Sequence, residues 1–265
     1  LLGIFSLSFI PPLVLTFVYS ESGKEIFLYS FIFFSILGAS IWVTTRQKNL
    51  SLNISDGFII TTLFWVVLAC AGSIPFYFYG LGISDAIFES VSGITTTGAT
   101  TIVGLDNLPK SILLYRQLLQ WIGGMGLIVL AVAVMPALGI GGGQLYKMEL
   151  PGSHGNQKLT PKITDSAKAL WKIYVGLTLL CATLYLLSGM NLFDSIAHSL
   201  STVAGGGFST HDASIGFFNS MLIETVCIVF MLLSAASFAV HYVAIFGGKP
   251  LKYFYDSEFR FFLSV

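Results

Sequence analysis

Two short runs of threonine, alanine and glycine could bind a bare cation through their backbone. They are Thr95, Thr96, Thr97 and Gly98 (strip one) and Ala204, Gly205, Gly206 and Gly207 (strip two). Neither strip has a charged side chain, so the groups that it offers an ion are carbonyl oxygens. A dehydrated potassium ion needs a cage of such oxygens to replace its water, and extended threonine/glycine backbone forms such cages in ion-selective filters. Glycine suits the narrowest point because it reaches backbone angles closed to other residues and places no Cβ in the pore.

The two strips belong to a stretch that occurs twice, 109 residues apart. Residues 85–101 read DAIFESVSGITTTGATT, and residues 194–210 read DSIAHSLSTVAGGGFST. Six of the 17 positions are identical: Asp85/Asp194, Ile87/Ile196, Ser90/Ser199, Ser92/Ser201, Gly98/Gly207 and Thr101/Thr210. A repeat inside a membrane protein indicates one structural unit used several times around a shared axis. Either strip alone is also typical of a surface turn, but two strips in register favour a filter.

The composition is that of an integral membrane protein. Hydrophobic residues make up 55% of the 265 residues and charged residues only 10%, and the mean hydropathy is +0.83. Soluble domains carry about a quarter charged residues. The formal net charge of zero gives no indication of nucleic acid as a partner. The sequence offers no nucleophile–base pair, metal-ligand cluster or cofactor motif, so we predict neither an enzyme nor a cofactor, and no metal other than a transported ion.

A helix needs about 20 apolar residues to cross a bilayer core of roughly 30 Å. Six stretches qualify, which predicts an all-α integral membrane fold. They are residues 1–20, 26–45, 57–83, 111–139, 169–190 and 221–247. We expect Pro11 and Pro12 to bend the first, and the third can end near Pro75.

Two shorter helices are predicted at residues 85–94 and 194–203, directly before the strips. At 1.5 Å per residue each is about 15 Å long, so it can enter the membrane but cannot cross it. Its C-terminal end would bring partial negative charge to the pore. We therefore expect two units of outer helix, re-entrant pore helix, filter strip and inner helix, preceded by two extra transmembrane helices.

The basic residues predict the orientation. Those on one side are Arg46, Lys48, Lys147, Lys158, Lys162, Lys168, Lys172, Lys249, Lys252 and Arg260. Only Lys24 and Lys110 lie on the other side, so the first side is cytoplasmic by the positive-inside rule and the strips open outward. Acidic residues on or near the outer face would concentrate cations there. They are Glu21, Glu25, Asp85, Glu89, Asp106, Asp194 and Asp212.

A carbonyl cage needs oxygens from about four directions, and this chain supplies two strips. The others must come from a second copy or from sequence beyond Val265. Residues 251–265 read as the start of a third unit, which favours the second source, so we expect the chain to be part of a larger protein.

The sequence resembles the TrkH-like membrane subunit of bacterial Trk-type potassium uptake systems, in the Trk/Ktr/HKT superfamily. The resemblance covers essentially all 265 residues. It is most specific in FESVSGITTTGAT (88–100), GLDNLPKSILLYRQLLQWIGGMG (104–126) and HSLSTVAGGGFSTHDASIG (198–216). It implies four pore units in one polypeptide around one pore, of which this chain is the N-terminal half.

The resemblance also implies the cargo and the partners. It implies potassium uptake across the bacterial cytoplasmic (inner) membrane by a multi-pass protein in the lipid bilayer. It further implies a homodimer, with a peripheral cytoplasmic nucleotide-binding regulatory subunit (TrkA-like). A serine at the first filter glycine goes with sodium permeation in this family, so Gly98 implies potassium. The family usually has a larger apolar residue where this chain has Gly205, which implies a looser strip two.

The expected division of the chain follows from these units. Residues 1–50 hold two N-terminal transmembrane helices, and 51–146 the first pore unit. Residues 147–168 form a cytoplasmic linker, 169–250 the second pore unit, and 251–265 the start of the third. Thr160 and Pro161 predict a helix start within the linker.

Several single residues allow more than one reading. Glu89 and His198 occupy equivalent places on the short helices, where they could tune the field near the ions or serve as structural hydrogen-bonding groups. Arg116 and Glu224 are expected to hold the pore loops, and His241 to pack in the interior.

Three alternative functions stay open. One is a sodium-permeable or unselective cation transporter of the same fold, and another is a non-conducting membrane scaffold. An intramembrane hydrolase would need His198 paired with Ser199 or Ser201, which lie on the same short helix in poor geometry.

Overall fold

The computed structural model describes residues 2–45, 54–129, 160–236, 238–248 and 251–264. All regular elements within these ranges are helices. The end of the fourth expected span and residues 147–159 of the expected linker lie outside the described residues.

The first expected span changes helix type directly before its two prolines. It consists of α1 (Leu2–Phe5), a 3₁₀ turn η1 (Ser6–Phe9) and α2 (Ile10–Val18), with the prolines in the first turn of α2. Because Pro11 and Pro12 have no N–H, the carbonyls one turn earlier lose their α-helical partners, and the chain tightens there. The helix α3 (Lys24–Thr45) then runs back alongside.

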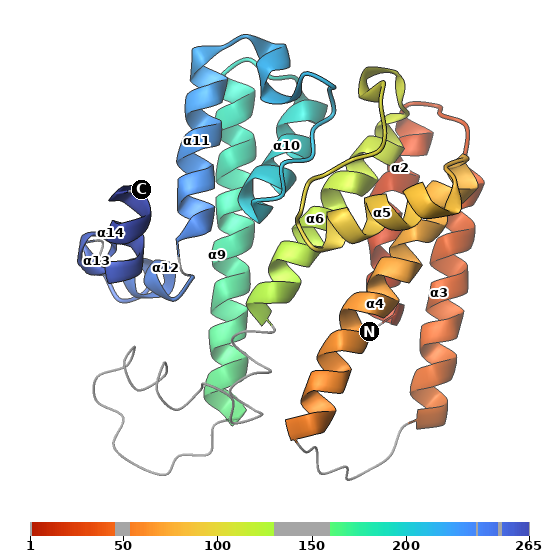
Figure 1. Ribbon diagram of the computed structural model, residues 1–265, viewed down its shortest axis with the longest axis horizontal. Coiled ribbons are helices and arrows are strands. Elements are labelled where there is room, and N and C mark those ends of the chain that lie inside the picture. Colours follow the sequence, from red (N-terminus) through yellow and green to blue (C-terminus); the bar gives the residue numbers. More distant parts are fainter. Residues whose placement is uncertain (1, 46–53, 130–159, 237, 249–250, 265) are drawn as a thin grey trace.

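Two triplets of helices follow, each with a short helix between two longer ones (Figure 1). The first triplet is α4 (Ile54–Tyr79), α5 (Ile83–Ile94) and α6 (Lys110–Val129), with a 3₁₀ turn η2 (Leu105–Asn107) before α6. The second is α9 (Thr160–Leu187), α10 (Leu192–Ala204) and α11 (Met221–Ala235), with η4 (Ser214–Phe218) before α11. Both predicted short helices are confirmed, and α9 begins at the predicted Thr160. Pro75 does not end α4, which continues to Tyr79.

The sixth expected span, residues 221–247, is not one helix. The helix α11 ends at Ala235, and Ala236 is extended, with ψ at 143°. The chain then turns into α12 (Phe238–Ile245), α13 (Lys252–Tyr255) and α14 (Ser257–Ser264) beside the foot of α11. His241 of α12 is buried, as expected, and its Nε2 lies 2.8 Å from the carbonyl oxygen of Leu233. The same carbonyl accepts the N–H of Ala236 at 3.2 Å, so His241 adds a second contact at the end of α11.

Three of the described helical segments are long and apolar enough to cross a membrane. They are Lys24–Thr45, Thr62–Tyr79 and Lys168–Leu187. Leu2–Val18 and Met221–Ala235 are apolar but shorter. The described part of the chain is therefore all-helical, with several candidate membrane spans.

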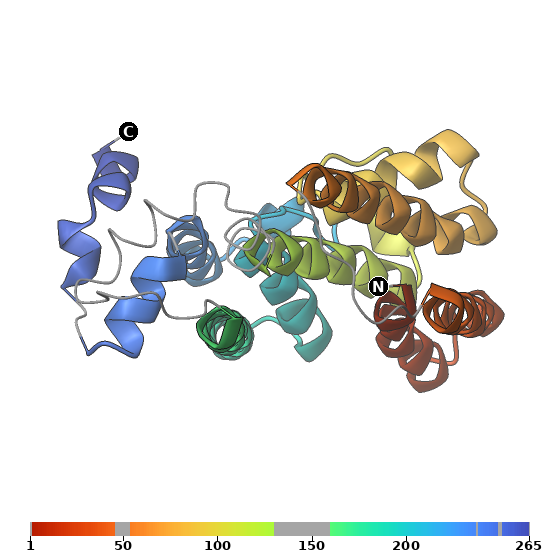
Figure 2. The same ribbon diagram turned by 90° about the horizontal axis from the view of Figure 1, so that it is seen from below.

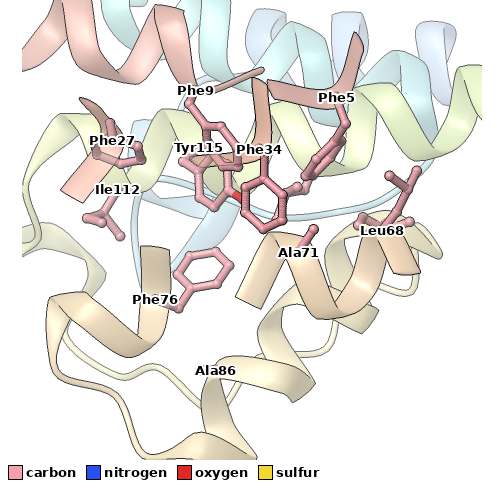
Figure 3. Packing of buried hydrophobic residues seen from close by; sticks show 12 residues of the cluster. Phe5, Phe9, Phe27, Phe34, Leu68, Ala71, Phe76, Ala86, Ile112 and Tyr115 are labelled. Atoms are coloured by element: carbon pink, nitrogen blue, oxygen red, sulfur yellow. The ribbon is translucent and has the colours of Figure 1, made fainter. Parts of the chain in front are cut away.

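The helix α6 lies between the two halves of the molecule, as both views show (Figures 1 and 2). On one face its Tyr115 is fully buried among aromatic rings of η1, α3 and α4 (Figure 3). The ring centroid of Tyr115 lies 5.7 Å from that of Phe9 and 5.1 Å from that of Phe76, and its hydroxyl donates to the carbonyl of Gly72 at 3.0 Å.

The opposite face of α6 packs against the second triplet. Leu113 and Leu114 contact a cluster that includes Phe193 and Leu200 of α10. Nearer the C-terminal end of α6, the ring of Trp121 stacks on that of Tyr174 of α9, with ring centroids 5.5 Å apart. One helix of the first triplet therefore forms part of the core of both.

Candidate functional site

The helices α5 and α10 end in the same way, and each end leads into a strip. The N–H of Thr96 donates to the carbonyl of Gly93 at 3.0 Å, and that of Thr97 donates to Ser92 at 2.9 Å. At the equivalent positions in strip two, the corresponding bonds are Gly205 to Thr202 at 3.1 Å and Gly206 to Ser201 at 3.0 Å. This is the pattern in which a left-handed residue closes a helix, and that residue is Thr96 (φ 56°) in one strip and Gly205 (φ 67°) in the other.

A second residue with positive φ follows two positions later in each strip. Gly98 has φ at 77° and Gly207 has φ at 80°, whereas the intervening Thr97 and Gly206 do not have positive φ. Alternation in the sign of φ lets successive peptide groups face the same side, unlike the groups of an ordinary extended strand. The sequence repeat is therefore also a repeat of backbone conformation.

The two strips lie directly against each other. A Cβ built on Gly98 would stand 1.9 Å from the carbonyl oxygen of Gly206, far inside van der Waals contact. By contrast, a Cβ on Gly207 would have no atom within 4 Å. Gly98 is thus required by both its backbone angle and its neighbour, and Gly207 by its angle alone.

Part of each strip faces open space. Thr95, Thr97, Gly205 and Gly207 are exposed. A hollow of about 260 Å³ borders the three glycines of strip two and extends to Met231 of α11. The strips therefore have free backbone on one side and packed helices on the other.

A buried ion pair is hydrogen-bonded to the residues that follow strip one. Glu89 of α5 and Arg116 of α6 are both fully buried, with Nε of Arg116 at 3.1 Å from Oε2 of Glu89. The other carboxylate oxygen of Glu89 accepts hydrogen bonds from the hydroxyl of Thr100 and from the N–H of Thr101, the latter at 2.8 Å. Arg116 also donates to the carbonyl of Ser209, beyond strip two, at 3.2 Å. This pair thus ties the segments that follow both strips to α6.

His198 in the second triplet and Glu89 in the first each bond to the hydroxyl of the residue that lies two positions after its strip. The Nε2 of His198 lies 3.0 Å from the hydroxyl of Ser209, the residue equivalent to Thr100. Glu89 and His198 were each expected either to tune the field near the ions or to form structural hydrogen bonds. In the structure both side chains form such hydrogen bonds. The serines Ser199 and Ser201 bond elsewhere, to the carbonyl of Ile196 and to the side chain of Gln120.

Acidic side chains join the loop before α6 to the loop before α11. The carboxylate of Asp212 accepts the N–H groups of Gly104 and Leu105 at 3.0–3.1 Å. His211 lies between two carboxylates, with Nδ1 against Asp106 and Nε2 3.3 Å from Asp194. The hydrogen bond from His211 and that from the backbone of Asp212 lower the pKa of Asp106 below its ordinary value of 3.8. We call this set of contacts the outer clasp.

Comparison with known proteins identifies the family. The TrkH family, described as "Cation transport protein", matches residues 23–264. The "Trk system potassium uptake protein TrkH" of Vibrio parahaemolyticus is 49% identical, and the alignment covers 100% of this chain and 56% of the relative. The protein of the same name from Escherichia coli K12 is 47% identical over 99% of this chain and 55% of the relative.

A solved structure agrees with the sequence match. The crystal structure of the potassium transporter TrkH from Vibrio parahaemolyticus superposes with a TM-score of 0.88 at 46% identity, covering 100% of this chain and 54% of the other. The chain belongs to the TrkH family of cation transport proteins. It spans about half the length of the relatives it matches. The family consists of transport proteins, so the prediction that the chain is not an enzyme is confirmed.

In this TrkH-family chain, all eight predicted strip residues lie in one region, at the ends of α5 and α10. Arg116 holds the segments beyond the strips, as expected. Glu224 is exposed on α11, and its carboxylate makes no hydrogen bond within the described ranges, so its expected contact with a pore loop is absent there. The position of Glu224 near the end of a helix was therefore not enough to predict a contact with a pore loop.

Sequence reasoning did not identify Gln120, and it placed Glu21 among the outer acidic residues without predicting its partner. Gln120 of α6 accepts hydrogen bonds from Ser201 at 2.7 Å and from the N–H of Phe208 at 3.1 Å. Glu21 accepts the first two N–H groups of α6, those of Lys110 at 2.7 Å and Ser111 at 3.1 Å. The available signal for Gln120 was its polarity in an apolar span, beside Arg116. For Glu21 nothing in the sequence indicates a contact 89 residues away.

Proposed function

We propose that this chain is the first part of a potassium uptake protein, in which ions pass through a backbone-carbonyl filter that includes strips one and two. The whole relatives are named for potassium uptake, and this chain carries the corresponding half. The helices α5 and α10 would be re-entrant pore helices, each between an outer and an inner helix.

The observation that carries the proposal is the repeated alternation of φ. Positive φ recurs at Thr96 and Gly98 and at Gly205 and Gly207, at the same 109-residue spacing as the sequence repeat. A surface turn has no need to reproduce such a pattern twice, whereas a filter built from several strips needs each strip to present carbonyl oxygens in the same way. The adjacency of Gly98 and Gly206 supports a shared ion path.

Further features of the proposal concern the complete protein. We place residues 51–146 and 169–250 in pore units one and two of four, after two extra helices in 1–50, with 147–168 a cytoplasmic linker and 251–265 the start of unit three. The complete protein would reside in the bacterial cytoplasmic membrane as a homodimer. A TrkA-like nucleotide-binding subunit would dock on its cytoplasmic side.

The test is potassium uptake by the full-length protein in cells that lack their own uptake systems, at low external potassium. We expect Gly98→Asp and Gly207→Asp each to abolish uptake, because each adds a side chain and a charge beside carbonyl oxygens at a backbone angle that L residues rarely adopt. Membrane expression of each variant is measured in parallel.

Gly216→Asp is the matched control. Gly216 lies in the outer segment after strip two, with no positive φ and no atom near a built Cβ, so it should tolerate the same change. Uptake that survives both filter substitutions would reject the filter. Absence of uptake by wild type would favour a non-conducting scaffold. Equal uptake of sodium and potassium by wild type would indicate an unselective transporter.

A further inference from the structure

Gln120 occupies the place where strip two and strip one meet. Its side chain is fully buried. A Cβ built on Gly206 would stand 2.3–2.6 Å from the three atoms of the Gln120 amide, so the amide packs flat against that glycine. The Nε2 atom of the same amide is 3.7 Å from the Cβ position of Gly98. This one side chain therefore borders a glycine of each strip.

The hydrogen bonds of Gln120 enclose strip two. Its Oε1 accepts from Ser201, in the last turn of α10, and from the N–H of Phe208, the residue directly after the strip. Ser201 in turn accepts the N–H of Gly206 through its carbonyl at 3.0 Å. The segments directly before and after strip two are thus hydrogen-bonded to a single oxygen atom.

Strip one is closed differently, although the residues correspond. Its equivalent serine, Ser92, donates directly to the carbonyl of Ala99 at 2.5 Å. In the second triplet, the corresponding contact between Ser201 and Phe208 runs through Gln120 instead. The residue equivalent to Gln120 in α11 is Val229, which has no amide. Within the described residues the amide bridge is found at strip two, which consists of one alanine and three glycines.

We propose that Gln120 is a positioning residue that sets the ion selectivity of the filter, by fixing the geometry of strip two against strip one. Glycine loses more backbone freedom on ordering than any other residue, so a run of three glycines needs an external hold to keep its carbonyls in place. This inference rests on the proposed function, because it assumes that ions contact the strips.

The experiment compares potassium with sodium uptake by the full-length protein reconstituted in liposomes. We expect Gln120→Met to lower the potassium-to-sodium uptake ratio about tenfold or more, the change produced by about 1.4 kcal/mol of lost discrimination. Methionine keeps the length of the side chain but leaves Ser201 and the N–H of Phe208 without their acceptor. Ser201→Ala should lower the ratio in the same direction, and should add little in a Gln120→Met background, because both changes break one bridge.

Gln117→Met is the matched control. Gln117 lies one turn earlier on α6, is also fully buried, and within the described part of the chain neither of its amide atoms has a hydrogen-bond partner. Its replacement should leave the uptake ratio unchanged. A similar fall in both glutamine variants, or no fall in Gln120→Met, would overturn the inference.

Two further outcomes are separable. If Gln120→Met is not recovered in the membrane, the ratio measured for Ser201→Ala decides alone: a fall supports the bridge, and an unchanged ratio refutes it. If wild type itself shows no preference for potassium, the proposed function fails, independently of any effect of Gln120.

Discussion

Thr96 has the least favourable backbone conformation in the site for its residue type. It is β-branched and adopts φ at 56°, a region that costs a non-glycine residue about 1–2 kcal/mol. Its role as the residue that closes α5 is one that glycine usually fills. The chemistry of threonine therefore did not predict this conformation, but its alignment with Gly205 at 109 residues could have done so.

The ion pair of Glu89 and Arg116 gives a prediction for single residues. Glu89→Ala should destabilise the protein by about 3–5 kcal/mol, because it leaves a buried guanidinium without its counter-charge. The measurement is the thermal unfolding midpoint of the full-length protein in detergent. Glu224→Ala, at an exposed position on α11, serves as the control. A Glu89→Ala protein as stable as wild type would mean that Phe208, whose ring lies 4.2 Å from Cζ of Arg116, and Ser209 hold the arginine without help.

At the scale of elements, α6 organises the site. Arg116 and Gln120 lie four positions apart on it and so share one face, from which they reach segments beyond both strips. Gly123, one turn further along, would meet the carbonyl of Ile94 at 1.9 Å if it carried a Cβ. The helix α6 is thus shaped to receive the end of α5 and strip two together.

The N-terminus of α6 provides an element-scale prediction. Glu21→Ala should lower stability by about 1 kcal/mol, since it removes the carboxylate that accepts the two leading N–H groups of the helix. Glu25→Ala removes an exposed carboxylate four residues further along the chain, and it should lower stability less. The comparison uses thermal midpoints of the two variants. Equal shifts would indicate a general effect of outer charge rather than a cap.

The helices themselves were predictable to different degrees. The short helices followed from the length of the apolar stretches around the strips, and the prolines of the first span indicated where its helix type changes. The end of α11 at Ala235 was not predictable, because Ser234, Ala235 and Ala236 include neither proline nor glycine. Beside this end lies His241, whose Nε2 is 2.8 Å from the carbonyl oxygen of Leu233, a tertiary contact that sequence periodicity does not reveal.

At the scale of the whole molecule, acidic residues expected to attract cations also join the two triplets. The outer clasp connects Asp106 and Gly104 of the first with His211 and Asp212 of the second. Sequence charge alone placed these carboxylates on the outer face but could not assign their partners, which lie more than 100 residues away. The strips themselves were predictable because each is a short contiguous run and the run occurs twice in the sequence.

The outer clasp predicts a pH dependence of stability. The pKa of Asp106 is lower in the folded protein than its ordinary value of 3.8, so its charged form stabilises the fold. This contribution is complete above the ordinary value and is lost as the pH falls through the lower folded value. At pH 6 the thermal unfolding midpoint of wild type should therefore be higher than that of Asp106→Asn. This difference between the two midpoints should shrink below pH 3.8.

Glu224→Gln is the control for that titration, because its carboxylate has no hydrogen-bond partner in the described part of the chain. A difference between wild type and Asp106→Asn that stays constant down to the lowest pH would exclude the charge of Asp106 as its source.

The position of α6 has a consequence for biosynthesis. A chain is made from its N-terminus, so Arg116 and Gln120 are in place before strip two leaves the ribosome. Strip one is held by Ser92 and Glu89, which precede it by a few residues, and by Arg116 of the same triplet. The first triplet is therefore available as a surface against which strip two can be ordered, and the order of translation matches the order in which the contacts become available.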